Sequence, residues 1–287
     1  SVATLWDSPQ SPRAVDADAI GQPADVRGWL ASMSLSQRLA LNGRVDSQLL
    51  LGERVVVDRE QGQWAHVVVP DQPTPLDARG YPGWLPLVQL SFRAPADTVQ
   101  EAIVATPTAW LYTGTSPTLE VSMATRLPVL GTDPGWVRSE TPDGTAVSVR
   151  SADVVVASRG SVAFPASGSD VVRMAHLFDG LPYLWGGTSG FGFDCSGLTQ
   201  WSYMQAGLVI PRTSRAQYAA LRHVPLDQLA PGDLVFYATD VTNPATIHHV
   251  GMYLGAGLSI YAPETGDVVK IGAVGYGENE ITTSATK

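Results

Sequence analysis

Alternating apolar and polar residues dominate residues 1–92 and predict a small β-barrel. The segment LLLGERVVVDREQGQWAHVVV alternates on both sides of Gln61-Gly62. Two alternating runs around a glycine-containing turn are typical of a β-hairpin. One stretch differs, because apolar residues recur at roughly helical spacing between Ala24 and Leu41. We therefore expect a strand-rich barrel that carries one helix or a pair of helices.

A second strand-rich segment follows between about residues 95 and 158. It contains ATPTAWLYTGTSP, TRLPVLGTDPGWVRSETPDG and TAVSVRSADVVVA, which are short runs separated by turn residues. A Gly-Trp-Val sequence after the central turn corresponds to Gln-Trp-Ala in the first segment. This repetition predicts one type of barrel used twice.

The pattern changes at SRGSVAFPASG, where we place the last domain boundary. Beyond it, DVVRMAHLF and DCSGLTQWSYMQAG have helical character, whereas LAPGDLVFY, HHVGMYLG and LSIYAPETG resemble antiparallel strands. A chain of 287 residues is too long for one core, so several domains are expected. The predicted division is 1–92 for a barrel with a helical insertion, 93–160 for a second barrel, and 161–287 for an α+β domain.

Composition excludes several classes of function. The formal net charge of −9 leaves no basic stripe to neutralise phosphates, so we expect no nucleic-acid partner. No segment approaches the ~18 consecutive apolar residues of a spanning helix, so we expect no membrane span. The sequence has no Gly-rich phosphate loop with its lysine, and its histidines and one cysteine show no metal-ligand spacing. We therefore expect no cofactor and no metal.

Six ordered blocks in residues 169–287 resemble the NlpC/p60 family of papain-like cysteine peptidases. The blocks are YLWGG, DCSGLTQWSY, PRTS with a following glutamine, LAPGDLVFY, HHVGMYLG and IYAPETG. The two upstream segments are similar to bacterial SH3-like (SH3b) domains, through LLLGERV with GYPGWLPLVQL and through TRLPVL with GWVRSETPDG. An alternative is that they are simple spacer barrels. The resemblance implies an α+β multidomain fold: two small SH3-like β-barrels followed by a papain-like α+β catalytic domain.

The single cysteine, Cys195, stands at the predicted start of a helix. A lone cysteine is more often a small buried apolar residue than a nucleophile, and only its surroundings favour the second interpretation. A cysteine attacks as a thiolate, and at a helix N-terminus beside an imidazole its pKa can fall to roughly 3.5–7.5. The N–H groups of the first turn can also receive an oxyanion. Gly197 is expected to leave the space near the sulfur uncrowded.

The resemblance assigns the general base to His249, because the family's base directly precedes Val-Gly. His248 is next to it and, in a strand, points to the opposite face. The family usually has histidine or another polar residue twelve positions after the base, where this chain has Tyr261. We predict Tyr261 as the third catalytic residue. A backbone carbonyl, Glu264, or a purely packing role for Tyr261 remain alternatives.

The resemblance extends to γ-D-glutamyl-L-diamino acid endopeptidases, which implies a substrate and its binding residues. Those enzymes cleave after L-Ala-γ-D-Glu in stem peptides of peptidoglycan with a free N-terminal L-Ala. Asp194 is expected to hold the ammonium group. Tyr183, Trp185, Ser196 and Ser214 are expected to line the subsite, and Tyr81 to close over the amine. Arg212 is expected to be structural.

Two other functions stay open at this point. The chain can be a lytic endopeptidase for intact cell wall, in which the barrels bind glycan or cross-bridges. It can also be a wall-peptide-binding protein whose catalytic domain has weakened, because Tyr261 replaces the usual polar partner. For the leading function, freed peptides as substrate favour a cytoplasmic monomer. A removed export signal is compatible with a chain that starts at Ser1.

Overall fold

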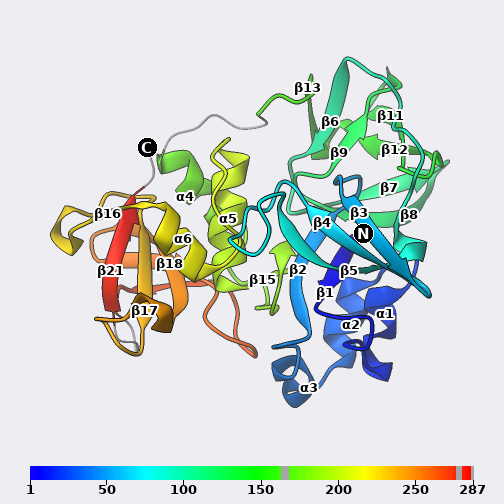
Figure 1. Cartoon of the computed structure of the whole chain (residues 1–287). Helices are drawn as coiled ribbons and strands as arrows, with labels where there is room; N and C mark the ends of the chain where they lie inside the picture. Colours follow the sequence, from blue (N-terminus) through cyan, green and yellow to red (C-terminus); the bar gives the residue numbers. More distant parts are fainter. Residues whose placement is uncertain (163–167, 276–279, 286–287) are drawn as a thin grey trace. The chain divides into compact units, whose positions relative to one another are not determined.

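The computed structural model describes residues 1–162, 168–275 and 280–285, and the chain divides into two compact units (Figure 1). The first unit comprises Ser1–Val67, Gly83–Ala163 and Ser189–Phe191, and the second comprises Val68–Pro82, Phe164–Thr188 and Gly192–Lys287. Residues 68–82 therefore share a compact unit with Cys195, although they follow the first predicted hairpin in sequence. Among the described residues, no helix is both long and apolar enough to span a bilayer.

The first barrel is built on a five-stranded sheet in the order β2-β1-β5-β4-β3. Its strands are β1 (Val2–Trp6), β2 (Val45–Leu50), β3 (Val56–Gln61), β4 (Trp64–Val69) and β5 (Tyr81–Pro86). The neighbouring strands β3 and β4 form the hairpin that the sequence predicts. Gly62 in its turn has φ 61°, a left-handed conformation that glycine adopts without a steric penalty.

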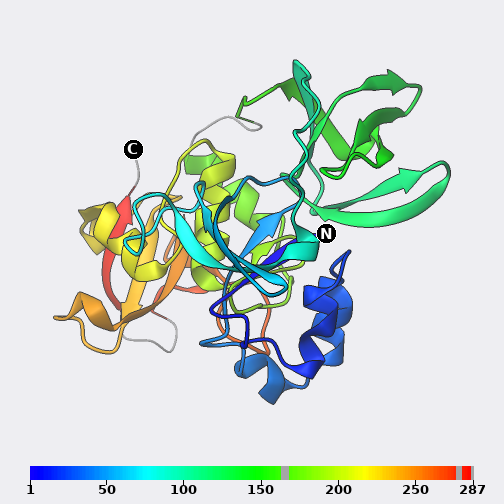
Figure 2. The ribbon, with the colours of Figure 1, turned by 45° about the vertical axis from the view of Figure 1, so that its right-hand side comes forward.

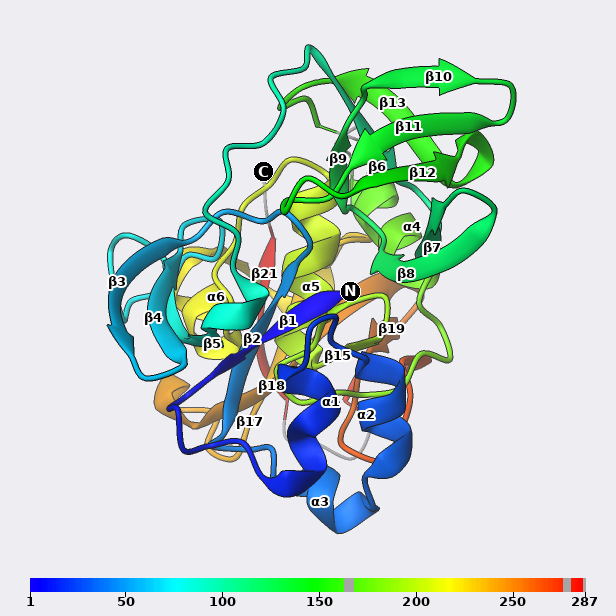
Figure 3. The ribbon, with the colours of Figure 1, turned by 90° about the vertical axis from the view of Figure 1, so that its right-hand side faces the viewer.

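The predicted helical stretch in this barrel forms two short helices, preceded by a third (Figure 3). The three are α1 (Ala17–Ile20), α2 (Val26–Ser32) and α3 (Leu35–Leu39). The break lies at Met33, which is extended (φ −86°, ψ 132°), and Ser34 then caps α3 by accepting from Gln37 N–H at 3.3 Å. The buried ring of Trp29 lies 6.0 Å from that of Trp6. This contact joins α2 to the barrel sheet.

The second barrel consists of a three-stranded and a five-stranded sheet, drawn in green (Figure 2). The three-stranded sheet has the order β13-β6-β9 and the other has the order β10-β11-β12-β7-β8. The strands are β6 (Gln100–Val104), β7 (Thr108–Thr113), β8 (Ser116–Ser122), β9 (Arg126–Pro128), β10 (Gly131–Asp133), β11 (Trp136–Glu140), β12 (Ala146–Arg150) and β13 (Val154–Ser158). Their inward residues form one small aliphatic core, which includes Val104, Leu111 and Val149.

In its described residues, the second unit has three α-helices and a six-stranded sheet in the order β16-β21-β17-β18-β19-β20 (Figure 1). The helices are α4 (Gly168–His176), α5 (Cys195–Gln205) and α6 (Ser214–Ala220). The strands are β16 (Arg222–Val224), β17 (Leu234–Ala238), β18 (Ile247–Gly255), β19 (Leu258–Tyr261), β20 (Lys270–Ala273) and β21 (Glu280–Ala285), with β14 (Thr188–Ser189) and β15 (Gly192–Phe193) forming a separate pair. The neighbouring strands of the six-stranded sheet run antiparallel. This arrangement confirms the predicted α+β class.

Helix α5 is the central element of the second unit, because almost all of its residues are buried. It packs against α4 and β18. The Trp201 ring lies 4.9 Å from that of Phe178 and 5.8 Å from that of Phe193, in edge-to-face geometry. Edge-to-face packing of this kind adds to the stabilisation from burial alone. The start of α5 is therefore held in a fixed position beside the sheet.

Candidate active site

Cys195 is the first residue of α5, and its side chain is buried. Asp194 caps the helix, because its carboxylate accepts a hydrogen bond from Gly197 N–H at 2.6 Å. A capping carboxylate satisfies one free N–H of the first turn and fixes where the helix begins. The sulfur thus lies at the end of a helix where backbone N–H groups favour negative charge.

Only a glycine fits at position 197, because the backbone of Gly187 occupies the space where a side chain would begin. The sequence had suggested a different reason for this glycine, namely open space near the sulfur. A Cβ at this position would overlap the carbonyl oxygen of Gly187. The same oxygen accepts a hydrogen bond from Asp194 N–H at 3.1 Å. The sequence did not reveal this contact, because the two glycines are ten positions apart in the chain. Gly197 therefore lets the loop before β14 pack onto the start of α5.

The carboxylate of Asp194 is paired with the guanidinium of Arg212 in the protein interior. Arg212 Nη2 lies 2.6 Å from Asp194 Oδ2, and Nη1 lies 3.0 Å from Oδ1. Burial opposes the charge on Arg212, but Asp194 outweighs it, so the pKa of the guanidinium is raised. Arg212 is only 1% exposed. The structural role predicted for Arg212 fits this pairing, but its partner Asp194 was not predicted from the sequence.

Burial raises the pKa of the Cys195 thiol to about 12, and the charge of Asp194 adds to this effect. The backbone N–H groups of Val250 and Ser196 act in the opposite direction but are weaker. The surroundings of Cys195 thus raise the pKa of its thiol, whereas the sequence had suggested a lowered pKa. A lone thiolate is unfavourable in this place because it loses its hydration and faces a carboxylate. Deprotonation of Cys195 must therefore be coupled to protonation of a nearby base.

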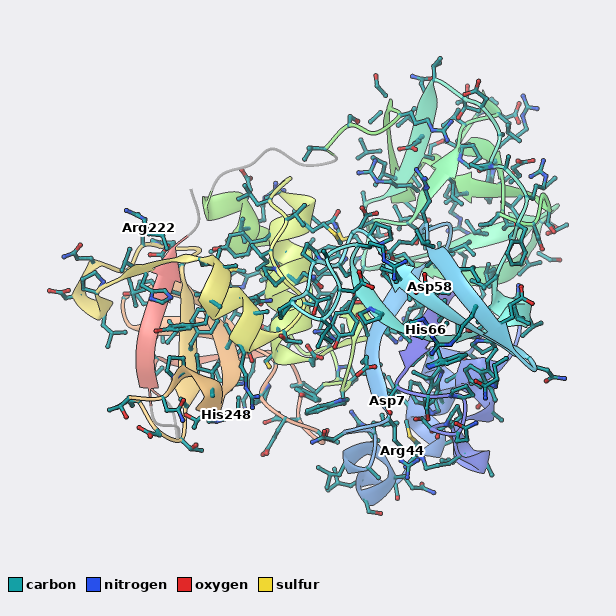
Figure 4. All side chains as sticks on the ribbon, in the orientation of Figure 1. Asp7, Arg44, Asp58, His66, Arg222 and His248 are labelled. Atoms are coloured by element: carbon teal, nitrogen blue, oxygen red, sulfur yellow. The ribbon has the colours of Figure 1, made fainter. Side chains whose placement is uncertain are left out.

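His249 is the predicted base, and it lies on β18, the strand that packs against α5. It is buried, and it immediately precedes Val250, whose N–H faces the sulfur of Cys195. The preceding residue, His248, is exposed (Figure 4). Its Nδ1 lies 3.3 Å from the Thr246 carbonyl oxygen. The alternation of a strand thus separates the two histidines, as expected. The structure thus places the Cys195 sulfur, at the start of α5, against the backbone N–H of the residue that follows His249 on β18.

Tyr261 lies on β19 next to the strand of His249. Its ring is buried and contacts the His249 ring edge-to-face, with 5.8 Å between centroids. Its hydroxyl lies over β20 at Gly272, where a Cβ would overlap it. Glu264, the alternative partner, is exposed. The predicted third residue is therefore in contact with His249, and its catalytic role stays a prediction.

The other predicted substrate residues differ in their contacts and in their burial. Ser196 hydrogen-bonds Asp194 at 3.2 Å and Arg212 at 3.0 Å. Tyr183 is buried, and burial together with the charges of Cys195 and Asp194 raises its pKa. Trp185 is half-buried, and Ser214 is buried.

Tyr81 begins β5 and belongs to the same compact unit as the cysteine. It is buried, and it is one of the groups that raise the pKa of Arg212, after Asp194. Tyr81 thus reaches the Asp194–Arg212 pair from a segment far away in sequence. Within the described chain, no group of three or more His, Cys, Asp or Glu side chains is placed to hold a metal.

Comparisons with known proteins cover nearly the whole chain. Residues 180–283 match the model of the NlpC/P60 family, and residues 104–156 match the model described as the YKFC SH3b2 domain. The chain is 38% identical over 274 residues to the gamma-D-glutamyl-L-lysine dipeptidyl-peptidase of Bacillus subtilis, covering 94% of this chain and 90% of that protein. The chain belongs to the NlpC/P60 family.

Two further similarities involve Bacillus cereus. A gamma-D-glutamyl-L-lysine dipeptidyl-peptidase of that organism is 40% identical over 280 residues, covering 94% of this chain and 84% of the relative. The crystal structure of an NlpC/P60 family protein from B. cereus superposes with a TM-score of 0.91 at 36% identity, covering 99% of this chain and 96% of the other. This NlpC/P60 protein is therefore a cysteine peptidase with the two-barrel arrangement inferred from its sequence.

The pKa of the cysteine leads to a prediction about its reactivity. In this NlpC/P60 site, His249→Ala removes the predicted base but leaves the burial of Cys195 and the Asp194 charge in place. We expect alkylation of Cys195 in this variant to be slow near neutral pH and to increase only at the alkaline end of the range, because the pKa of the thiol is raised, whereas the unmodified protein reacts near pH 7. Alkylation rates measured from pH 5 to 11 with a neutral thiol reagent test this. His248→Ala is the matched control and should keep the original profile; equal profiles for both variants would contradict the assignment of the base.

Proposed function

We propose that the chain hydrolyses the bond between γ-D-Glu and the diamino acid in peptidoglycan stem peptides that carry a free N-terminal L-Ala. One observation carries this proposal: a buried cysteine at a helix start adjoins a buried carboxylate and a base on the neighbouring strand. The near full-length relatives named gamma-D-glutamyl-L-lysine dipeptidyl-peptidase support the choice of bond.

The proposed reaction begins with transfer of the Cys195 proton to His249. The resulting thiolate attacks the γ-carbonyl carbon of D-Glu, and the oxyanion forms near the backbone N–H groups that begin α5. His249 then donates its proton to the leaving amine of the diamino acid as the C–N bond breaks. Water, deprotonated by His249, attacks the thioester and releases L-Ala-γ-D-Glu. The thiol is regenerated at the end of the cycle.

Recognition of the ammonium group by Asp194 has to fit the contacts this carboxylate already makes. Five donors reach it: Gly186 N, Gly197 N, Ser196 Oγ and the two Arg212 Nη atoms. A carboxylate offers about four lone-pair sites. We therefore propose that a bound ammonium replaces the Ser196 hydroxyl on Asp194, since a hydroxyl rotates at little cost. The freed Ser196 hydroxyl then becomes available to the ligand.

A matched pair of peptides tests the proposed specificity. The tripeptide L-Ala-γ-D-Glu-L-Lys and its form acetylated at the L-Ala amine differ only at that amine, where acetylation removes the positive charge and adds an acetyl group. We expect kcat/KM to fall about 100-fold on acetylation, because a charge-assisted hydrogen bond is lost in a buried site. Mass spectrometry of the products identifies the bond that is cut.

Three controls separate the alternatives to this specificity. Equal rates for the two tripeptides would contradict amine recognition, and faster release from purified sacculi would favour a lytic enzyme. The diaminopimelate tripeptide, run in parallel, reports which diamino acid is preferred.

We also propose that the protein is a monomer and is cytoplasmic, as expected for an enzyme that acts on freed peptides. The proposed domain division is 1–92, 93–160 and 161–287.

A further inference from the structure

The imidazole of His249 lies between two tyrosine rings that come from the strands on either side of it. Tyr237 is its register partner on β17, and their ring centroids are 5.4 Å apart with an interplanar angle of 45°. Tyr261 on β19 approaches from the other side, at 5.8 Å and 89°. All three side chains are buried, with exposed fractions of 3%, 8% and 7% for Tyr237, His249 and Tyr261.

This arrangement restricts the imidazole mechanically. β17, β18 and β19 are consecutive in the sheet, so the two tyrosines are anchored on independent strands. The next position on the same face of β18 is Gly251, where a Cβ would lie 3.3 Å from Tyr261 Cβ. A ring held on two sides in a buried site has few alternative rotamers.

The same rings also affect the charge that His249 carries during catalysis. Both ring centroids lie within ~6 Å of the imidazole centroid, the distance range in which a cation over the face of an aromatic ring is attracted to it. Titratable and charged groups on the elements packed against β18 include Cys195 and the Asp194–Arg212 pair at the start of α5, the Asp170–Arg173 pair of α4, and Arg215 of α6, whose Nε donates to the Ile247 carbonyl oxygen at 2.9 Å. Asp194 favours an imidazolium, whereas Arg212 and Arg215 oppose it, so the two rings act on His249 among charges of both signs.

Gly272 on β20 provides the space that the outer ring needs. A Cβ at Gly272 would overlap the Tyr261 hydroxyl and lie 3.2 Å from two of its ring carbons. Its backbone φ lies outside the left-handed range that favours glycine. Space rather than backbone conformation therefore explains the glycine, and that space sets how close the Tyr261 ring comes to His249.

We propose that Tyr237 is a positioning residue for His249, and that its ring and the ring of Tyr261 together orient the imidazole toward Cys195 and stabilise its protonated form. The aromatic ring, and not the phenol hydroxyl, supplies the effect of Tyr237. This inference rests on the proposed function, because it assigns His249 as the base. It extends that function by naming a residue on a third strand that acts through the base.

Substitutions at Tyr237 separate the ring from the hydroxyl. Tyr237→Phe keeps the ring and loses the hydroxyl, whereas Tyr237→Met keeps much of the volume and loses the ring. We expect Tyr237→Met to lower kcat about tenfold with KM unchanged within about twofold, and Tyr237→Phe to stay within about twofold of the original. Tyr253→Met is the matched control, because it makes the same replacement at a half-buried tyrosine of β18, four residues beyond His249.

The rate of Cys195 alkylation near pH 6.5 is the second readout. Loss of the ring shifts the balance from thiolate and imidazolium toward thiol and neutral imidazole, so Tyr237→Met should react about five to ten times more slowly than Tyr237→Phe. This measurement needs no peptide, so it tests the positioning role even if the proposed peptide is not the substrate. If the tripeptide is not cleaved but alkylation behaves as expected, the proposed function fails and the inference stands.

Two outcomes would overturn the inference. Equal alkylation profiles for Tyr237→Met and the unmodified protein would show that the ring does not act on His249. A loss in Tyr237→Phe as large as that in Tyr237→Met would assign the effect to the hydroxyl instead. If Tyr237→Met does not fold, as judged by its thermal transition, Gly272→Ala provides an independent test from the other side. It should displace the Tyr261 ring and slow alkylation, and an unchanged rate would again contradict the inference.

Discussion

Replacing Arg212 with methionine is expected to lower the free energy of unfolding by about 3–5 kcal/mol. The guanidinium is 1% exposed, and two of its nitrogens hold the Asp194 carboxylate at 2.6 and 3.0 Å. Methionine fills a similar volume but leaves that carboxylate buried without its counter-charge. The cost is therefore that of an unpaired buried charge rather than of a cavity. Urea unfolding followed by tryptophan fluorescence measures it.

An exposed ion pair in the same unit provides the control for this prediction. Arg173 lies 3.1 Å from Asp170 on α4, and its side chain is 57% exposed. Arg173→Met should cost less than about 1 kcal/mol, because solvent screens an exposed pair. In the double variant Arg212→Met with Asp194→Asn, the orphaned charge is absent, and part of the lost stability should return. If Arg212→Met unfolds at the same urea concentration as Arg173→Met, the Asp194–Arg212 pair contributes nothing to stability.

Replacing Cys195 with alanine is expected to reduce kcat/KM for the tripeptide by about 10⁴-fold or more, since catalytic groups that act as a unit fail together. The fold should persist, because alanine removes only a buried sulfur and the cap at Asp194 does not depend on it. Product formation followed by chromatography measures the activity, and a thermal transition checks the fold.

The matched change for Cys195→Ala lies on the same helix. Ser202 is buried on α5 and donates to the Leu198 carbonyl oxygen at 2.7 Å. Ser202→Ala removes one side-chain heteroatom, just as Cys195→Ala does, and should retain activity within about twofold. A Cys195→Ala protein that keeps more than a hundredth of the original rate would place the nucleophile elsewhere.

Local sequence signals predicted much of the fold because the forces behind them act over short distances. The turn at Gln61-Gly62 and the alternation on either side identify the β3–β4 hairpin, and Gly62 has the left-handed backbone that such a turn uses. The helical pair was also visible, although its break at Met33 was not. The order of blocks in the last domain pointed to its family and to Cys195 and His249 as the residues to examine.

The electrostatic character of the site was not predictable in the same way. Asp194 and Arg212 are eighteen positions apart, and neither pattern nor motif shows that they share one buried place. The raised pKa of Cys195 follows from burial and from Asp194, so it depends on how α5 packs against β18. The expected lowering considered the helix and the imidazole but not the loss of water around the sulfur.

The sequence by itself determined which residue types carry the chemistry and which local elements hold them, because capping, turn formation and strand alternation depend on neighbours in the chain. Only the tertiary structure decided their partners: Arg212 for Asp194, Gly187 against Gly197, and two tyrosine rings around His249. Those contacts join separate elements. Their strength comes from removing water between groups that meet only after the chain has folded.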